Sequence, residues 1–163
     1  MDDIIYINDL VAGQVNFTVD DRLRWNNPQT RIKYTAESGL SDWESEVSGT
    51  ITGKNTSPYY TTQLPNIDQA EEVYIGTSVT GVTTCAFRGC TSLKIVTVPE
   101  GVEAIGQAVF QECAGLETAS IPNSVTSFNT NSFRDCSSLG DIAIPNGTTS
   151  IGNYAFSGCS RLT

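Results

Sequence analysis

Cysteines are the residues of this chain whose type and spacing could most readily do chemistry. They stand at positions 85, 90, 113, 136 and 159, and the last four are each 23 residues apart. An odd number of thiols without a Cys-x-x-Cys pair fits neither a closed disulfide framework nor a zinc ribbon. Histidine is absent, which removes Cys/His and Ser/His nucleophile pairs and every metal site that needs an imidazole.

Two explanations of the cysteine ladder are open. Stacked repeats would bring equivalent Cα atoms to about 5 Å, which a disulfide tolerates, so a redox or metal column is one of them. The other is packing, because a buried free cysteine behaves as a small hydrophobe. Ile67 takes the same position in an earlier, degenerate copy of the repeat. Since isoleucine shares only size and burial with cysteine, packing is favoured, and no metal or cofactor is expected.

Adjacent carboxylates are the other candidates for chemistry. They occur as Asp2 and Asp3, Asp20 and Asp21, and Glu71 and Glu72. Neighbours on a strand point to opposite faces, so these pairs do not form a general acid and base by themselves. No loop of the Asp-x-Asn-x-Asp-Gly type indicates a calcium site. Solvated surface is therefore the favoured interpretation, and we predict that the protein is not an enzyme.

Charge and hydropathy exclude two further classes of partner. The chain has 9 Lys and Arg against 18 Asp and Glu, a net charge of -9, whereas a surface for nucleic acid needs clustered cations. No apolar stretch approaches the roughly 20 residues that span a membrane. The first residues are acidic where a signal peptide would be basic. We expect neither nucleic-acid binding nor membrane insertion.

The 23-residue spacing extends far beyond the cysteines. A phenylalanine stands three residues before each of the last four cysteines, and a leucine stands three residues after it. After each of the first three of these leucines the chain continues with an alternating apolar pair and a proline, which indicates a short strand that the proline ends. An extended piece and a single helical or 3-10 turn complete the unit. The predicted repeat core comprises Phe87, Cys90, Leu93, Phe110, Cys113, Leu116, Phe133, Cys136, Leu139, Phe156, Cys159 and Leu162.

These units resemble the BspA-type leucine-rich repeat family, whose repeat reads roughly Leu-x-x-Ile-x-Ile-Pro-x-x-Val-x-x-Ile-Gly-x-x-Ala-Phe-x-x-Cys. The segment from Ile142 to Leu162 matches this pattern almost position by position, and the resemblance covers about residues 64 to 163. It implies the α/β class: a right-handed leucine-rich-repeat solenoid with one short strand per repeat and short helical or 3-10 turns. It implies no catalytic residues. The family is found in surface and adhesion proteins of gut and oral bacteria, in some protists, and in phages of such hosts.

Residues 1 to 60 do not align with the repeat, and we predict that they form a small, separate, β-rich anchor module before the repeats at 61–163. Strand-like runs lie at 4–7, 15–19, 31–36 and 47–51, with turn residues between them. Alternatively, residues 1 to 20 are an extended arm that adds strands to a partner's sheet. Because a solenoid needs an end cap and Thr163 falls in mid-repeat, we expect the array to continue beyond 163 or to be covered there.

The candidates for partner contact in this module are aromatic. Trp25, Trp43, Tyr59 and Tyr60 could stack on sugars or anchor a protein interface, because such residues are enriched at binding hot spots. The competing interpretation is that a sixty-residue module needs both tryptophans for its own core.

The predicted function is that of a non-enzymatic interaction or adhesion protein. Residues 1 to 60 would attach it to protein partners in a larger assembly, such as a phage virion in which it is a fibre or decoration protein. The repeats would bind a host-surface protein or glycan. The expected location is the virion or the bacterial cell surface. The alternatives are a bacterial cell-surface adhesin of the BspA kind and a small hydrolase module targeted by the repeats, for which no residue spacing gives support.

Overall fold

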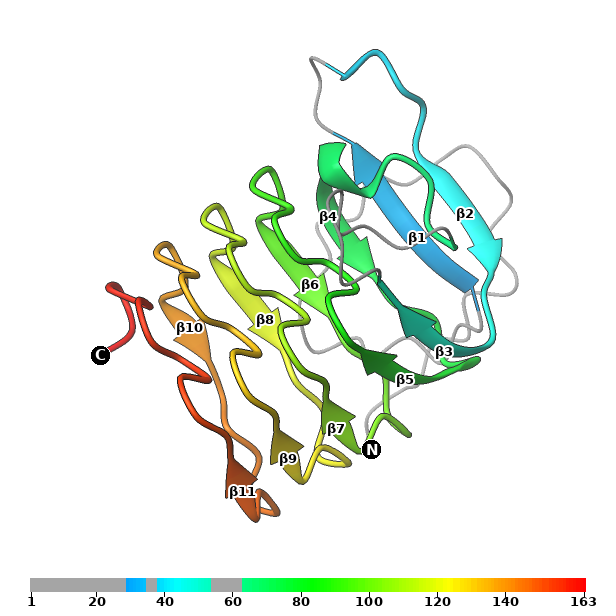
Figure 1. Ribbon diagram of the computed structural model, residues 1–163. Coiled ribbons are helices and arrows are strands. Elements are labelled where there is room, and N and C mark those ends of the chain that lie inside the picture. Colours follow the sequence, from blue (N-terminus) through cyan, green and yellow to red (C-terminus); the bar gives the residue numbers. More distant parts are fainter. Residues whose placement is uncertain (1–28, 35–37, 54–62) are drawn as a thin grey trace, which may run out of the picture.

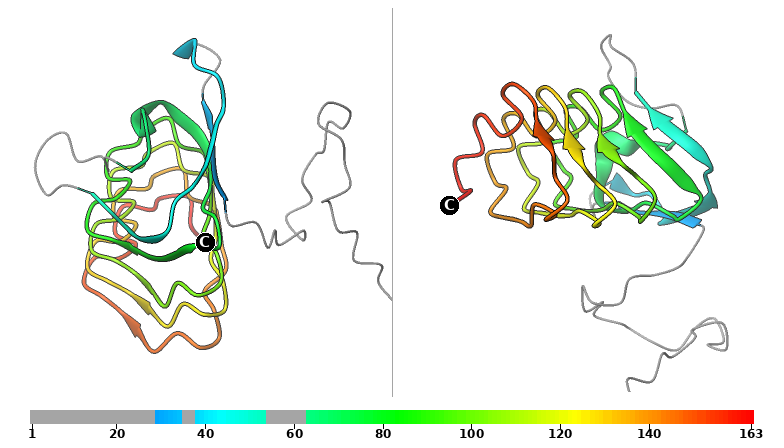
Figure 2. Two further views of the ribbon diagram at one scale, coloured as in Figure 1. Left: turned by 90° about the vertical axis from the view of Figure 1, so that its right-hand side faces the viewer. Right: turned by 90° about the horizontal axis from the view of Figure 1, so that it is seen from below.

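Each 23-residue unit folds into one coil of a solenoid, and each coil contributes a strand to each of two sheets (Figure 1). The computed structural model describes residues 29–34, 38–53 and 63–163. Within these residues, sheet A has the strand order β10-β8-β6-β4-β1-β2, and sheet B has the order β11-β9-β7-β5-β3. The predicted leucine-rich-repeat solenoid is confirmed, and the views along and across the stack show its successive coils (Figure 2).

The strands are short, and all but the first few occur at the repeat spacing. Sheet A contains β1 (Gln29–Tyr34), β2 (Trp43–Glu46), β4 (Ala70–Tyr74), β6 (Ile95–Thr97), β8 (Thr118–Ser120) and β10 (Asp141–Ile142). Sheet B contains β3 (Gly49–Thr52), β5 (Val79–Thr83), β7 (Ala104–Ile105), β9 (Ser127–Phe128) and β11 (Ser150–Ile151). A 3-10 helix, η3 (Ile67–Gln69), precedes β4.

The register of the parallel strands equals the period of the sequence. Val73 of β4 pairs with Val96 of β6, which pairs with Ala119 of β8. All three side chains are buried, so the alternation in the repeat directs like residues into the interior. The extended piece expected after the proline also pairs with its neighbours and forms sheet B, as when Ile105 pairs with Phe128. Each repeat therefore carries two short strands where the pattern indicated one strand and a short extended piece.

The remaining side of each coil consists of consecutive turns rather than helix. Main-chain bonds between residues three apart run through it, as from Cys113 N–H to the Phe110 carbonyl (3.1 Å), which is the 3-10 pattern that the sequence indicates. These turns also bond to the next coil, since the N–H of Ala108 donates to Thr130 at 3.0 Å and that of Phe110 to Ser132 at 2.8 Å. Neighbouring coils are thus joined along three lines: sheet A, sheet B and this turn ladder.

The turn ladder depends on left-handed backbone at a fixed place in every coil. The residues at this place have φ between 54° and 60°, a conformation that costs an L-residue about 1–2 kcal/mol. They are Cys85, Ala108, Asn131 and Tyr154, none of which is glycine. The N–H groups of the first three donate to carbonyls of the following coil at 3.0 Å. Hydrogen bonds between coils therefore stabilise a conformation that the local sequence does not favour.

The described part of residues 1 to 60 continues the two sheets of the array. Strand β1 pairs antiparallel with both β4 and β2, and β3 pairs parallel with β5. Ile32 and Ile51 belong to the same hydrophobic core as the repeats. Tyr34 donates its hydroxyl to the Pro65 carbonyl at 2.7 Å, and the buried Thr30 hydroxyl accepts the Gly76 N–H at 3.0 Å. The first coil thus completes the edges and the apolar packing of these strands.

The strand predictions for this region have different outcomes. The runs at 31–36 and 47–51 correspond to β1 and β3, while β2 was not anticipated. The runs at 4–7 and 15–19 lie outside the described residues. The boundary at residue 60 and the anchoring role stay predictions.

In the part of the chain that the structure describes, no helix has the length and apolar character needed to cross a membrane.

Ser132 is an exception among the apolar columns of the interior. It occupies the position that is Val109 in the coil before and Ala155 in the coil after, and it is fully buried. Its hydroxyl has no hydrogen-bond partner. A buried polar group without a partner costs free energy, because it has lost its bonds to water.

We expect Ser132→Ala to raise the free energy of unfolding by about 1 kcal/mol, because it removes this unpaired hydroxyl at nearly constant volume. Chemical denaturation of the two proteins measures the difference. Ser127→Ala, at a partly exposed position of β9, is the matched control and should change stability by less than about 0.5 kcal/mol. A clear loss of stability in Ser132→Ala would show that the hydroxyl has a partner.

Candidate functional site

The cysteine column lies in the interior beside the turn ladder. All five cysteines are free and buried. Three thiols donate to the main chain of the preceding coil: Cys113 to the Phe87 carbonyl, Cys136 to Phe110 and Cys159 to Phe133, with Sγ···O distances of 3.0, 3.0 and 3.1 Å. The side chain at this position is therefore both a packed group and a hydrogen-bond donor between coils.

The surroundings of Cys90, Cys113 and Cys136 suppress thiol chemistry. Burial raises the pKa of the Cys113 thiol to about 12 and that of Cys90 well above its ordinary value. The hydrogen bond with Cys159 and burial together raise the pKa of Cys136. Because the thiolate is the nucleophile and the metal ligand, these thiols are inert at neutral pH. Among the described residues, no three Cys, Asp or Glu side chains are grouped so that they could hold a metal ion.

A column of stacked phenylalanines accompanies the cysteines. The rings lie nearly parallel, with centroid distances of 5.2 Å for Phe87–Phe110, 4.9 Å for Phe110–Phe133 and 5.4 Å for Phe133–Phe156. These separations are close to the spacing of neighbouring strands, so the rings keep the pitch of the sheets. Leu93, Leu116 and Leu139 are fully buried, whereas Phe156 and Leu162 of the last coil are partly buried. The structure places all the predicted repeat-core residues in or against one hydrophobic cluster.

Of the four predicted aromatic contact residues, Trp43 belongs to the described part of the chain. Trp25, Tyr59 and Tyr60 lie outside the described residues, as do Asp20 and Asp21. Trp43 is the first residue of β2, where its backbone pairs with Ile32 of β1. A binding role for these aromatic residues stays a prediction.

The adjacent carboxylates Glu71 and Glu72 are bound to two different lysines on the surface. Lys33 of β1 contacts Glu72 at 2.6 Å, and Lys94 of the next coil contacts Glu71 at 2.5 Å. The hydrogen bond with Lys94 lowers the pKa of Glu71, and the one with Glu72 raises the pKa of Lys33. Tyr74 donates its hydroxyl to Glu72 at 2.8 Å. The two carboxylates therefore link neighbouring strands and do not form an acid and base pair.

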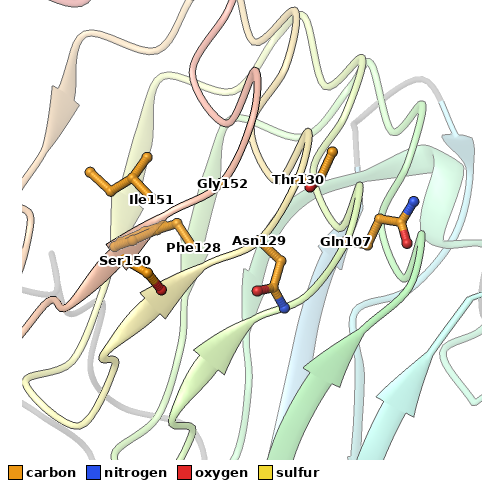
Figure 3. Close-up of a pocket in the computed structure, with 7 residues that line it drawn as sticks. All are labelled: Gln107, Phe128, Asn129, Thr130, Ser150, Ile151 and Gly152. Carbon is orange, nitrogen blue, oxygen red and sulfur yellow. The ribbon is translucent and has the colours of Figure 1, made fainter.

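One hollow of about 300 Å³ lies on the sheet B side, beside the ends of β9 and β11 (Figure 3). Its floor is main chain held closely between coils: a Cβ at Gly152 would stand 2.7 Å from the Thr130 nitrogen, and the Gly152 N–H donates to the Phe128 carbonyl at 2.7 Å. The lining residues are Gln107, Phe128, Asn129, Thr130, Ser150, Ile151 and Gly152.

The side chains around the hollow are neutral and available. Gln107, Asn129, Thr130 and Ser150 are exposed, and within the described chain these four side chains form no hydrogen bond or ion pair. Ile151 contributes an apolar wall that is 55% exposed. The hollow therefore offers amide and hydroxyl groups without charge, which suits binding rather than acid–base catalysis.

The family model described as BspA type leucine rich repeat region matches residues 62–163. The chain belongs to this family. Solenoids of this kind present extended surfaces for interaction with other molecules. The comparison with curated proteins gives no match.

Solved structures show the same fold at low sequence identity. A leucine-rich repeat protein from Bacteroides ovatus has a TM-score of 0.56 at 22% identity, covering 91% of this chain and 40% of that protein. One from Eubacterium ventriosum has 0.58 at 21%, covering 80% and 36%. The T. pallidum leucine-rich repeat protein has 0.53 at 25%, covering 69% and 66%. The chain thus spans well under half the length of the first two proteins.

The lining of the hollow was not singled out from the sequence, although a signal existed. Gly106, Asn129 and Gly152 share one place in the BspA-type repeat, and Gln107 and Thr130 share the next. In a single unit they look like ordinary turn residues. The hollow becomes visible only when the coils stack, because small Gly positions then flank the Asn129 side chain.

The burial of the BspA-type cysteine column predicts its reactivity. Denatured, unreduced protein should expose all five thiols to a thiol reagent, whereas the folded protein should react slowly at neutral pH because all five are buried. Absorbance titration measures both. Fewer than five thiols in the denatured, unreduced protein would instead indicate a disulfide between coils.

The Cys113 thiol should also make stability fall in alkaline solution. Its pKa is about 12 in the folded protein against an ordinary 9.0, so above pH 9 the unfolded chain releases a proton that the folded chain retains. The free energy of unfolding then decreases as the pH rises, with a share of about 1 kcal/mol from this thiol by about pH 10. Chemical denaturation at about pH 8 and pH 10 should show a smaller decrease for Cys113→Ala. Equal decreases in the two proteins would contradict this.

Proposed function

We propose that this BspA-type protein is a non-enzymatic interaction protein that binds a protein or glycan of a host surface through its repeats. The observation that carries the proposal is the difference between the inward and the outward positions of the coils. Inward positions repeat the same residue types, while the outward place that is Thr97 in β6 is Ser120 in the next coil and Ala143 in the one after. Outward side chains can vary without disturbing the ladders, which is how solenoids acquire binding surfaces.

The reactive groups of the repeats support a binding role. The five thiols are buried, burial raises the pKa of the Cys90 and Cys113 thiols, and Glu71 and Glu72 are bound by lysines. Exposed side chains of the repeats include hydroxyls and amides, such as those of Ser120, Asn129 and Thr130, which can recognise a partner by hydrogen bonding.

The N-terminal region is proposed to attach the protein to a larger assembly. The two settings are a phage virion, in which it would be a fibre or decoration protein, and a bacterial cell surface, on which it would be an adhesin. Both agree with membership of the BspA-type family. Mass spectrometry of purified phage particles and of cell-envelope fractions separates the settings, because the protein should be enriched in one of them.

Binding of the labelled full chain to intact host cells tests the main proposal. Binding should saturate and should fall after the cells are treated with periodate, which destroys sugars, or with protease. Thr97→Arg with Ser120→Arg alters the outward face of sheet A, and Thr126→Arg with Thr149→Arg alters the sheet B side. One of these double variants should lose binding while the other keeps it. Absence of saturable binding to any host surface, or equal binding by both variants and the wild type, would overturn the proposal.

A further inference from the structure

We infer that the hollow beside β9 and β11 is a subsite for one uncharged pyranose unit of a glycan. The inference rests on the proposed function, which it makes more specific by naming the ligand chemistry and the residues that recognise it. Figure 3 shows Asn129 between Ser150 on one side and Gln107 on the other, so that side chains from three successive coils border the same space.

The polar side chains match the hydroxyl pattern of a sugar. The amides of Gln107 and Asn129 each carry two donors and an acceptor, and the hydroxyls of Thr130 and Ser150 both donate and accept. None of these four side chains forms a hydrogen bond or ion pair with another described residue. Sugar hydroxyls also donate and accept, so a sugar hydroxyl can form a hydrogen bond with any of these amide or hydroxyl groups.

The absence of charge among the lining residues decides the class of ligand. A phosphate, sulfate or carboxylate would need arginine or lysine, and a cation would need carboxylates, but the lining holds none of these. The exposed Ile151 provides an apolar wall against which the C–H face of a pyranose can pack. Phe128 is only 1% exposed, so it closes the base of the hollow and is not a stacking platform.

The size and rigidity of the hollow fit a single sugar unit. Its volume of about 300 Å³ is at the lower end of the range of ligand pockets. The floor is fixed by ladder bonds, including Asn129 N–H to the Ile105 carbonyl at 2.9 Å, so the lining is held in place before a ligand arrives. A peptide added to a strand would bond mainly to main-chain groups and would leave these amides unused.

Nuclear magnetic resonance of the full chain tests the inference directly, because side-chain NH₂ groups give their own signals. The probes are glucose, galactose, mannose and N-acetylglucosamine, each titrated separately. Gln107→Ala and Asn129→Ala identify the two NH₂ signals by their loss. At least one sugar should shift both signals saturably, with a dissociation constant of about 1 mM or weaker, as expected for so few contacts.

A matched pair of asparagine variants gives the decisive comparison. Asn129→Ala should weaken binding of that sugar about tenfold, because a hydrogen-bonding group is lost. Asn123→Ala removes an exposed asparagine of the same coil that lies outside the hollow, and binding should stay the same. Both positions are exposed, and thermal unfolding checks that both variants fold. Gln107→Ala should weaken binding in the same direction and gives an independent second measurement.

Three results would overturn the inference: no sugar shifts the two signals, Asn129→Ala and Gln107→Ala leave sugar affinity unchanged, or an uncharged tripeptide shifts them and no sugar does. Its failure is distinguishable from failure of the proposed function. If Asn129→Ala binds host cells as the wild type does and no sugar shifts the signals, the repeats bind elsewhere and only the subsite is wrong. If the sugar binds but the intact protein attaches to no host surface, the proposed function is wrong and the subsite stands.

Discussion

Main-chain hydrogen bonding between coils, at an offset of 22 to 24 residues, is the constraint on which the rest of the structure depends. On sheet A the Lys94 N–H donates to the Glu71 carbonyl, and on sheet B the Gly106 N–H donates to the Val82 carbonyl. On the turn side the Cys85 N–H donates to the Gln107 carbonyl. Because all three sides of a coil are tied to the next, each residue stacks on its counterpart one repeat away. A chemical repeat in the sequence thereby becomes a set of columns in space.

The columns explain why residues with reactive side chains have structural roles here. A thiol at this position fills a small apolar space and reaches the carbonyl of a phenylalanine in the coil before, as Cys136 does with Phe110. An ionised thiolate would lose the donor and would be buried without compensation, so the same environment that fits the thiol raises its pKa. The proposed recognition therefore falls to the outward side chains. On the sheet B side, uncharged outward side chains line the hollow around Asn129.

The strands before the first full coil show how the stack begins. Strand β1 extends sheet A beyond β4 and runs antiparallel to it, unlike the parallel strands of the repeats. Strand β3 extends sheet B beyond β5 and runs parallel to it, as the strands of the repeats do. The register of β1 against β4 shifts between Lys33, which pairs with Glu72, and Tyr34, which pairs with Ala70 and donates its hydroxyl to the Pro65 carbonyl. Atypical terminal segments of this kind cover apolar layers that a regular coil would leave exposed.

The period of the repeat, its columns of like residues and the buried positions all follow from the amino-acid sequence alone. The spacing of Phe110, Cys113 and Leu116 reports which positions are buried, and in a repeat protein burial follows from contacts with the neighbouring unit, which has the same sequence. Features that depend on how closely neighbouring coils approach one another are seen only in the folded molecule. Left-handed backbone at Ala108 has no local signal, because the hydrogen bonds that stabilise it come from the next coil. The hollow around Asn129 and the joining of β1 to β4 were likewise decided by packing, since pattern and propensity in one segment do not specify which distant segment it meets.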